Sequence, residues 1–99
     1  MFGLTDQEIQ QLKVYLAAIP EIKRAWIYGS RAKGNYKAFS DVDLTLEGVA
    51  LTRRHLLRLA TQLHDSSLPY QFDLSLYDTL KNPDLLSHIG RCGRIIYEK

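Results

Sequence analysis

The sequence predicts a single small α/β (α+β) domain, because helical and strand patterns alternate along the whole chain. The chain has 99 residues, of which 45% are hydrophobic and 24% charged, so it can bury one modest core and is not disordered. A net charge of +2 is too small to indicate nucleic-acid binding by itself. We therefore expect one domain over residues 1–99, without nucleic acid as a direct substrate.

The composition also indicates a compartment. No apolar run approaches the roughly 20 residues of a membrane span, and the polar N-terminal helix gives no sign of a secretory signal. Cys92 is the single cysteine, which excludes an internal disulfide and fits a reducing environment. We expect a cytoplasmic protein with no membrane partner.

The N-terminal half is predicted to contain one long helix and two strands. Thr5 and Glu8 have the spacing of a capping box, which starts a helix that Pro20 ends. The other elements expected here are a strand over residues 22–28, a helical turn over 31–33, a loop over 34–40 and a strand over 41–47.

The C-terminal half is predicted to contain two helices and two strands. Thr52 can cap the first helix, and Asn82 with Pro83 is typical of the cap and first position of the second, which Gly90 or Gly93 ends. The strands are expected over residues 70–77 and 94–97. The first helix is expected to bury Leu56, Leu59, Ala60 and Leu63.

Three aspartates lie in the predicted strands. Asp41 and Asp43 alternate with apolar residues, so their carboxylates share one face about 6.6 Å apart. Asp73 lies in the middle of its strand, where an unpaired charge is costly, although an ordinary edge-strand charge is the alternative. Carboxylates grouped in this way suit Mg²⁺, which prefers oxygen ligands and bridges to phosphates.

A glycine and a serine end the first predicted strand. Gly29 lets the backbone approach a ligand closely, its amide and the next can point at phosphate oxygens, and Ser30 adds a hydroxyl. Alone, this pair would indicate only a turn; with the aspartates that follow, it indicates a triphosphate site. Arg31 or Lys33 could neutralise the pyrophosphate part of such a triphosphate, with Arg31 favoured, although both are also interpretable as solvated loop charges.

Other candidate residues have structural interpretations. Tyr36 and Phe39, in the loop, could stack on a nucleobase or simply pack. We expect the side chains of Trp26 and Phe72 to lie in the core. The side chains of His55, His64 and His88 are expected on helix surfaces.

The two motifs together resemble a known signature. Gly29-Ser30-Arg31-Ala32-Lys33-Gly34, followed by Ser40-Asp41-Val42-Asp43-Leu44, is similar to the pattern of the polymerase-beta-like nucleotidyltransferase superfamily. The Gly-Ser-Arg-Ala-x-Gly motif and the short chain most resemble the MNT-type minimal nucleotidyltransferases of this superfamily. The resemblance implies the nucleotidyltransferase fold, a small mixed β-sheet flanked by helices, with residues 1–99 as one minimal nucleotidyltransferase domain.

The resemblance also implies a site. Two Mg²⁺ ions would be held by Asp41, Asp43 and Asp73, the three expected catalytic residues. A nucleoside triphosphate, expected to be ATP, would be bound by Gly29, Ser30 and Arg31.

Members of this type are typically paired with a HEPN-domain protein in toxin–antitoxin arrangements. The resemblance therefore implies transfer of AMP to a hydroxyl of the partner protein, within a hetero-oligomer. One alternative is a non-catalytic subunit that neutralises its partner by occlusion. Another is a small-molecule nucleotidyltransferase, which is disfavoured because no substrate domain is visible.

Overall fold

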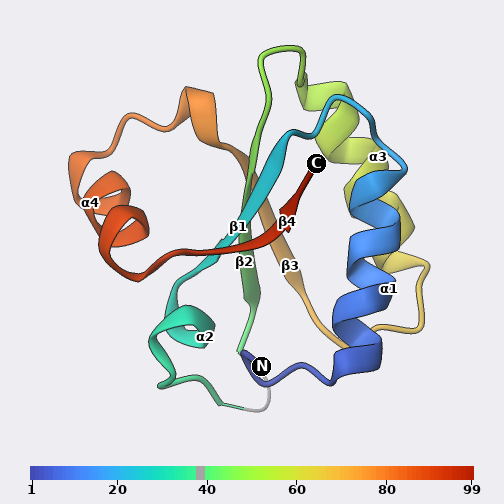
Figure 1. The fold of residues 1–99 in the computed structure, drawn as a ribbon, viewed down its shortest axis with the longest axis horizontal. Helices are drawn as coiled ribbons and strands as arrows, with labels where there is room; N and C mark the ends of the chain where they lie inside the picture. Colours follow the sequence, from blue (N-terminus) through green and yellow to red (C-terminus); the bar gives the residue numbers. More distant parts are fainter. Residues whose placement is uncertain (38–39) are drawn as a thin grey trace.

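The computed structural model describes residues 1–37 and 40–99, and it confirms the predicted α/β class. Its strands form one mixed sheet in the order β3-β2-β1-β4 (Figure 1). β1 is antiparallel to both β2 and β4, whereas β3 is parallel to β2. The strand bounds are β1 Arg24–Tyr28, β2 Val42–Glu47, β3 Phe72–Leu76 and β4 Arg94–Glu98.

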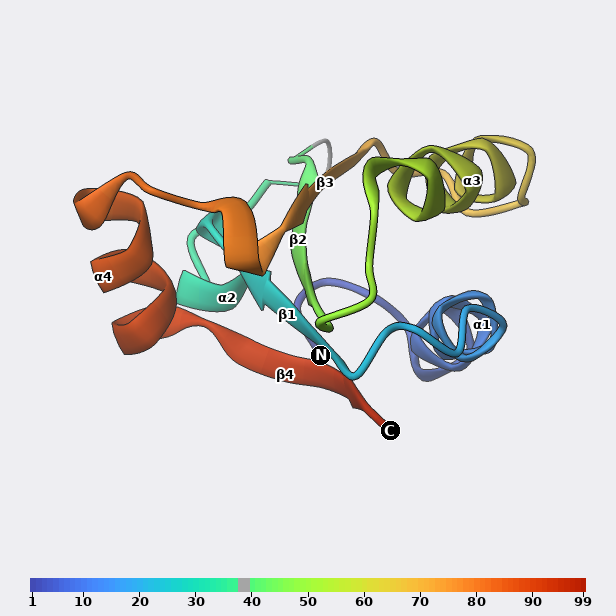
Figure 2. The same cartoon turned by 90° about the horizontal axis from the view of Figure 1, so that it is seen from above.

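The helices flank this sheet unequally. Figure 2 shows α1 (Asp6–Ala17) and α3 (Arg53–His64) on one face of the sheet, with α4 (Pro83–Cys92) on the opposite side. Two short elements complete the chain, α2 (Ser30–Lys33) after β1 and the 3-10 helix η1 (Tyr77–Thr79) after β3. Within the described residues, no helix is long and apolar enough to cross a bilayer.

The helix starts that the sequence predicted are confirmed in atomic detail. The Thr5 hydroxyl accepts the Glu8 amide at 3.1 Å, and the Glu8 carboxylate accepts the Thr5 amide at 2.8 Å, which completes the capping box of α1. Asn82 caps α4 by accepting the amide of Asp84 at 2.9 Å, with Pro83 in the first turn. These ends are fixed by residues within a few positions of one another.

The core lies between the sheet and the pair α1 and α3. Its fully buried members come from both layers, and Leu12, Leu16, Ile27, Leu44, Leu59 and Leu63 are among them. The prediction that Ala60 is buried is wrong, because Ala60 is exposed and lines a groove between α3 and the chain before β3. The aliphatic positions of β1 and β2 therefore point toward α1 and α3, which leaves the other sheet face for polar groups.

Trp26 also differs from its prediction. It is only partly buried and lies on the sheet face opposite the core, where its indole Nε1 donates to Glu47 at 3.0 Å. Arg24, in the same row, bonds the same carboxylate at 2.9 Å. An indole has one polar edge that needs a partner, and this pairing satisfies it on a half-open surface.

Candidate functional site

Two of the predicted carboxylates are direct neighbours across the parallel strands. Asp43 on β2 and Asp73 on β3 are register partners, so both side chains leave the same sheet face, with strands roughly 4.8 Å apart. Tyr28 on β1 is paired with Asp43 in the same way. The row Tyr28, Asp43 and Asp73 therefore crosses three strands on the face opposite the core.

The electrostatics of this row follow from its crowding. Burial raises the pKa of Asp43, and the charges of Asp73 and Asp41 raise it further. Burial likewise raises the pKa of the Tyr28 hydroxyl, and the two carboxylates of the row add to that rise. The paired carboxylates of Asp43 and Asp73, with Asp41 near them, favour a cation that would offset their repulsion.

Asp41 lies at the margin of this row. β2 begins at Val42, so Asp41 precedes the strand instead of opening it as predicted, and its side chain is exposed. No three His, Cys, Asp or Glu side chains among residues 1–37 and 40–99 form a group that could hold a metal ion. The structure therefore brings Asp43 and Asp73 together but does not assemble Asp41 with them into one cluster.

Gly29 brings backbone directly against the Asp43 carboxylate. Its φ of 75° and ψ of −154° lie in a region that only glycine adopts readily. A Cβ built on Gly29 would collide with Asp43 Oδ2. The Gly29 backbone therefore lies directly against the Asp43 carboxylate, whereas its approach to a ligand stays a prediction.

The amide of Gly29 has a partner that the sequence did not reveal. His88 Nε2, on α4, accepts it at 2.9 Å. The His88 ring also meets the ring of Tyr28 edge-on, with centroids 6.2 Å apart. The prediction of a surface helix residue is wrong for His88, which is half-buried. A contact over 59 residues of sequence leaves no local signal.

Arg31 is placed differently from the expectation that it faces a nucleotide. It is 1% exposed, and its guanidinium donates to the Ser40 carbonyl at 3.1 and 2.9 Å and to the Phe2 carbonyl at 2.9 Å. The Tyr36 and Tyr70 rings lie 5.3 and 4.9 Å from the guanidinium carbon. In this structure Arg31 ties the loop before β2 to the N-terminal segment.

The burial of Arg31 changes which residues near it are candidates for contact with a nucleotide. Of the two cations considered for pyrophosphate, Lys33 is the exposed one, in the last turn of α2. Tyr36 packs over Arg31, in agreement with the packing alternative. Phe39, its proposed companion, lies outside the described residues. The Ser40 carbonyl that Arg31 holds immediately precedes Asp41, so the arginine also fixes the approach to the carboxylates.

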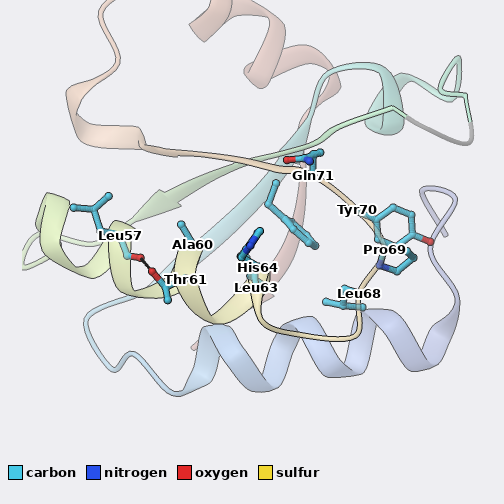
Figure 3. A pocket seen from close by; sticks show the side chains of 10 residues that line it. Leu57, Ala60, Thr61, Leu63, His64, Leu68, Pro69, Tyr70 and Gln71 are labelled. Carbon is cyan, nitrogen blue, oxygen red and sulfur yellow. Dashed lines mark hydrogen bonds between the residues drawn. The ribbon is translucent and has the colours of Figure 1, made fainter.

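A groove also lies on another part of the molecule. It has a volume of about 580 Å³, with α3 as one wall and the segment from Leu68 to Phe72 as the other (Figure 3). None of the three aspartates lines it. Phe72 lies on the core face of β3, so this groove belongs to the helix-covered side of the sheet.

Comparison with known proteins identifies the family of this chain. The family model described as "Polymerase beta, Nucleotidyltransferase" matches residues 10–99. The chain belongs to the polymerase-beta nucleotidyltransferase family. The superfamily recognised from Gly29-Ser30 and the aspartates is thereby confirmed. A comparison with curated proteins found no match.

Solved structures support the same fold. A toxin–antitoxin complex with AMP-PNP is 22% identical, with a TM-score of 0.73, covering 97% of this chain and 75% of that one. The MntA–HepT toxin–antitoxin is 18% identical, with a TM-score of 0.70, covering 96% and 74%. A tri-AMPylated HEPN toxin of Shewanella oneidensis in complex with MNT antitoxin is 20% identical, with a TM-score of 0.66, covering 100% and 74%. These three neighbours are toxin–antitoxin complexes, two of which are described as containing MNT or MntA, in agreement with the resemblance.

Proposed function

We propose that this polymerase-beta family member transfers AMP from ATP to a hydroxyl of a HEPN-type partner protein and acts as its antitoxin. In this Mg²⁺-dependent reaction the hydroxyl oxygen bonds to the α-phosphorus, the α–β phosphoanhydride bond breaks, and pyrophosphate leaves. The observation that carries the proposal is the in-register pair Asp43 and Asp73 beside the Gly29 turn. The structural neighbours support the nucleotide and the partner class, since one complex contains AMP-PNP and another a tri-AMPylated HEPN toxin.

The side chains present fit Mg²⁺ in their chemistry. Asp43 and Asp73 offer hard oxygen donors on one face. Burial, and after it the charges of Asp73 and Asp41, raise the pKa of Asp43, and a divalent cation would offset the like-charge part of that rise. Asp41, exposed just before β2, is the third carboxylate that we assign to the metal. When bound, Mg²⁺ would neutralise triphosphate charge and make the attacking hydroxyl more acidic.

The chain's own residues would divide the remaining work. Gly29 brings backbone close to the carboxylates, and since its own amide donates to His88, Ser30, which follows it, would hold the phosphates. Asp73 is exposed on β3, an edge strand, so a macromolecular hydroxyl can approach it. We assign to Asp73 the proton of that hydroxyl. Positioning and charge neutralisation account for most of such phosphoryl chemistry.

The test uses Asp73→Asn, with Asp78→Asn as the matched control. Asp78 is also exposed but lies beyond β3 in η1. Each purified variant is mixed with ATP, Mg²⁺ and a HEPN-domain protein of the same genome, and both chains are weighed by intact mass spectrometry. Wild type and Asp78→Asn should add one or more AMP masses to the partner, and Asp73→Asn none, while Asp73→Asn still binds Mg²⁺-ATP. Equal transfer by Asp73→Asn would refute its assigned role.

Occlusion of the partner without chemistry is the second candidate. It is favoured by one observation, that the described residues contain no ready group of three metal-binding side chains. The same mixture distinguishes it. If wild type adds no mass to the partner, yet both wild type and Asp73→Asn neutralise its toxicity, binding alone is the function.

A further inference from the structure

The hydrogen bond between Gly29 and His88 links α4 to the turn that follows β1. The Gly29 amide donates to His88 Nε2 at 2.9 Å, between residues 59 apart in sequence. A ring nitrogen accepts a hydrogen bond through its lone pair, so this bond uses Nε2 as the acceptor. The geometry therefore specifies the partner and the atom that accepts.

The turn needs such a partner because of its glycine. Glycine is conformationally permissive, and Gly29 adopts φ 75° and ψ −154° next to the Asp43 carboxylate. The Gly29 carbonyl accepts the Lys33 amide at 3.1 Å, so the bond to His88 holds the amide side of this residue. Tyr28, the preceding residue, already lies against the His88 ring, so the histidine contacts two successive residues at the end of β1.

The position of His88 on its helix is also well fixed. α4 starts at the Asn82 cap with Pro83 and buries Ile89, the residue next to His88. His88 is half-buried, and its acceptor nitrogen is used by Gly29. A side chain on a capped and partly buried helix makes a more stable anchor than a loop residue would.

We infer that His88 is the positioning residue of the nucleotide-binding turn: it holds the Gly29 peptide so that Ser30 and the following amides meet the triphosphate in one orientation. The inference rests on the proposed function for the identity of the ligand, and on the Gly29–His88 bond for the mechanism. Its chemical requirement is an acceptor at the place of Nε2, not a charge and not an aromatic ring.

That requirement sets the variants. His88→Gln carries an amide oxygen at about the reach of Nε2 and keeps an acceptor, whereas His88→Phe keeps a ring against Tyr28 but cannot accept. Ser87→Ala, at an exposed position one residue earlier on α4, is the control for general effects on the helix. Measurements are the KM for ATP and kcat of AMP transfer, and deuterium exchange of the Gly29 amide by NMR.

In His88→Phe, the KM for ATP should rise about three- to tenfold, the effect of one net hydrogen bond, while kcat stays within about twofold. His88→Gln and Ser87→Ala should keep KM near the wild-type value. The Gly29 amide should exchange faster in His88→Phe only. Equal KM values in all variants, a lower KM in His88→Phe, or equal losses in the Gln and Phe variants would overturn the inference.

Failure of the proposed function would look different. If wild type neither bound nor used ATP, the nucleotide assignment would fall, whereas faster Gly29 exchange in His88→Phe, restored in His88→Gln, would still establish the anchor. If Gly29 exchange were the same in all four proteins, the anchor itself would be refuted regardless of activity.

Discussion

Gly29 and Asp43 are packed so closely that a single methyl group at residue 29 would overlap the Asp43 carboxylate. The two residues lie on neighbouring strands or their ends, and Asp43 is the register partner of Tyr28. This contact brings the proposed phosphate-binding turn and the proposed metal-binding carboxylates within one small region. It also gives the glycine a requirement beyond its backbone conformation, since a Cβ at this position would collide with Asp43 Oδ2.

The first prediction compares two glycines with positive φ. Gly29→Ala adds backbone strain of about 1–3 kcal/mol and also the collision with Asp43. Gly34→Ala has a φ of 89° as well, but a Cβ there meets no atom within 4 Å, so its cost is about 1–2 kcal/mol. Denaturant unfolding should show the larger loss for Gly29→Ala. Equal losses would mean that the Asp43 carboxylate moves aside freely.

The second prediction concerns Asp43→Asn. The folded pKa of Asp43 is raised, so its ionised form costs stability, and this cost grows as pH rises from the unfolded value near 3.8 through the folded pKa. Asp43→Asn should therefore melt at or above the wild-type temperature at pH 7, while losing AMP transfer. The difference in Tm should shrink as pH falls toward 4. An unfolded variant at pH 7 would make Asp43 a structural residue.

The third prediction separates Arg31 from Lys33. Arg31→Lys cannot reproduce the fork that holds the Ser40 and Phe2 carbonyls, so stability should fall by more than about 1 kcal/mol. Lys33→Ala, on the exposed side of the same short helix, should change stability by less than about 0.5 kcal/mol but raise the KM for ATP. Thermal unfolding and steady-state kinetics on both variants measure the two effects.

The reverse pattern would restore the original assignment. A stable Arg31→Lys with impaired use of ATP would place the guanidinium at the nucleotide, whereas a Lys33→Ala with unchanged kinetics would remove Lys33 from the site.

The fourth prediction concerns the metal. The carboxylates of Asp41, Asp43 and Asp73 repel a triphosphate, so ATP should bind much more weakly in EDTA than in Mg²⁺ or Mn²⁺. Calorimetric titration under both conditions measures the difference. Asp78→Asn should behave as wild type, because its carboxylate lies beyond the row. Equal affinity with and without metal would argue against carboxylate-held Mg²⁺.

Local patterns predicted most of the fold. The capping box of Thr5 and Glu8 and the Asn82 cap are decided by residues within one helical turn, and the structure confirms them. The alternation of apolar and polar residues along β2 and β3 likewise predicted that Asp43 and Asp73 share the polar face of the sheet. The sequence thus predicted the face of each strand on which an aspartate lies, but not the register that pairs the two residues.

The remaining features depend on contacts between distant parts of the chain. Nothing near Arg31 indicates that Phe2 and Ser40 would enclose it, and nothing near His88 indicates Gly29. Trp26 has the neighbours of a core residue, but it occupies the face that Glu47 shares. Burial of such side chains depends on how whole helices and strands pack together. That packing leaves no repeating pattern of hydrophobic residues in the sequence.

Trp26 also gives the protein an internal optical probe. It is the single tryptophan of the chain, and it lies on the carboxylate face of the sheet. Its indole is hydrogen-bonded to Glu47, and Tyr28 lies two residues further along the same strand. Ligand binding over this face would alter the polarity around the indole, so its emission should shift without any added label. The chain thereby supplies its own fluorescence titration for nucleotide, metal and partner.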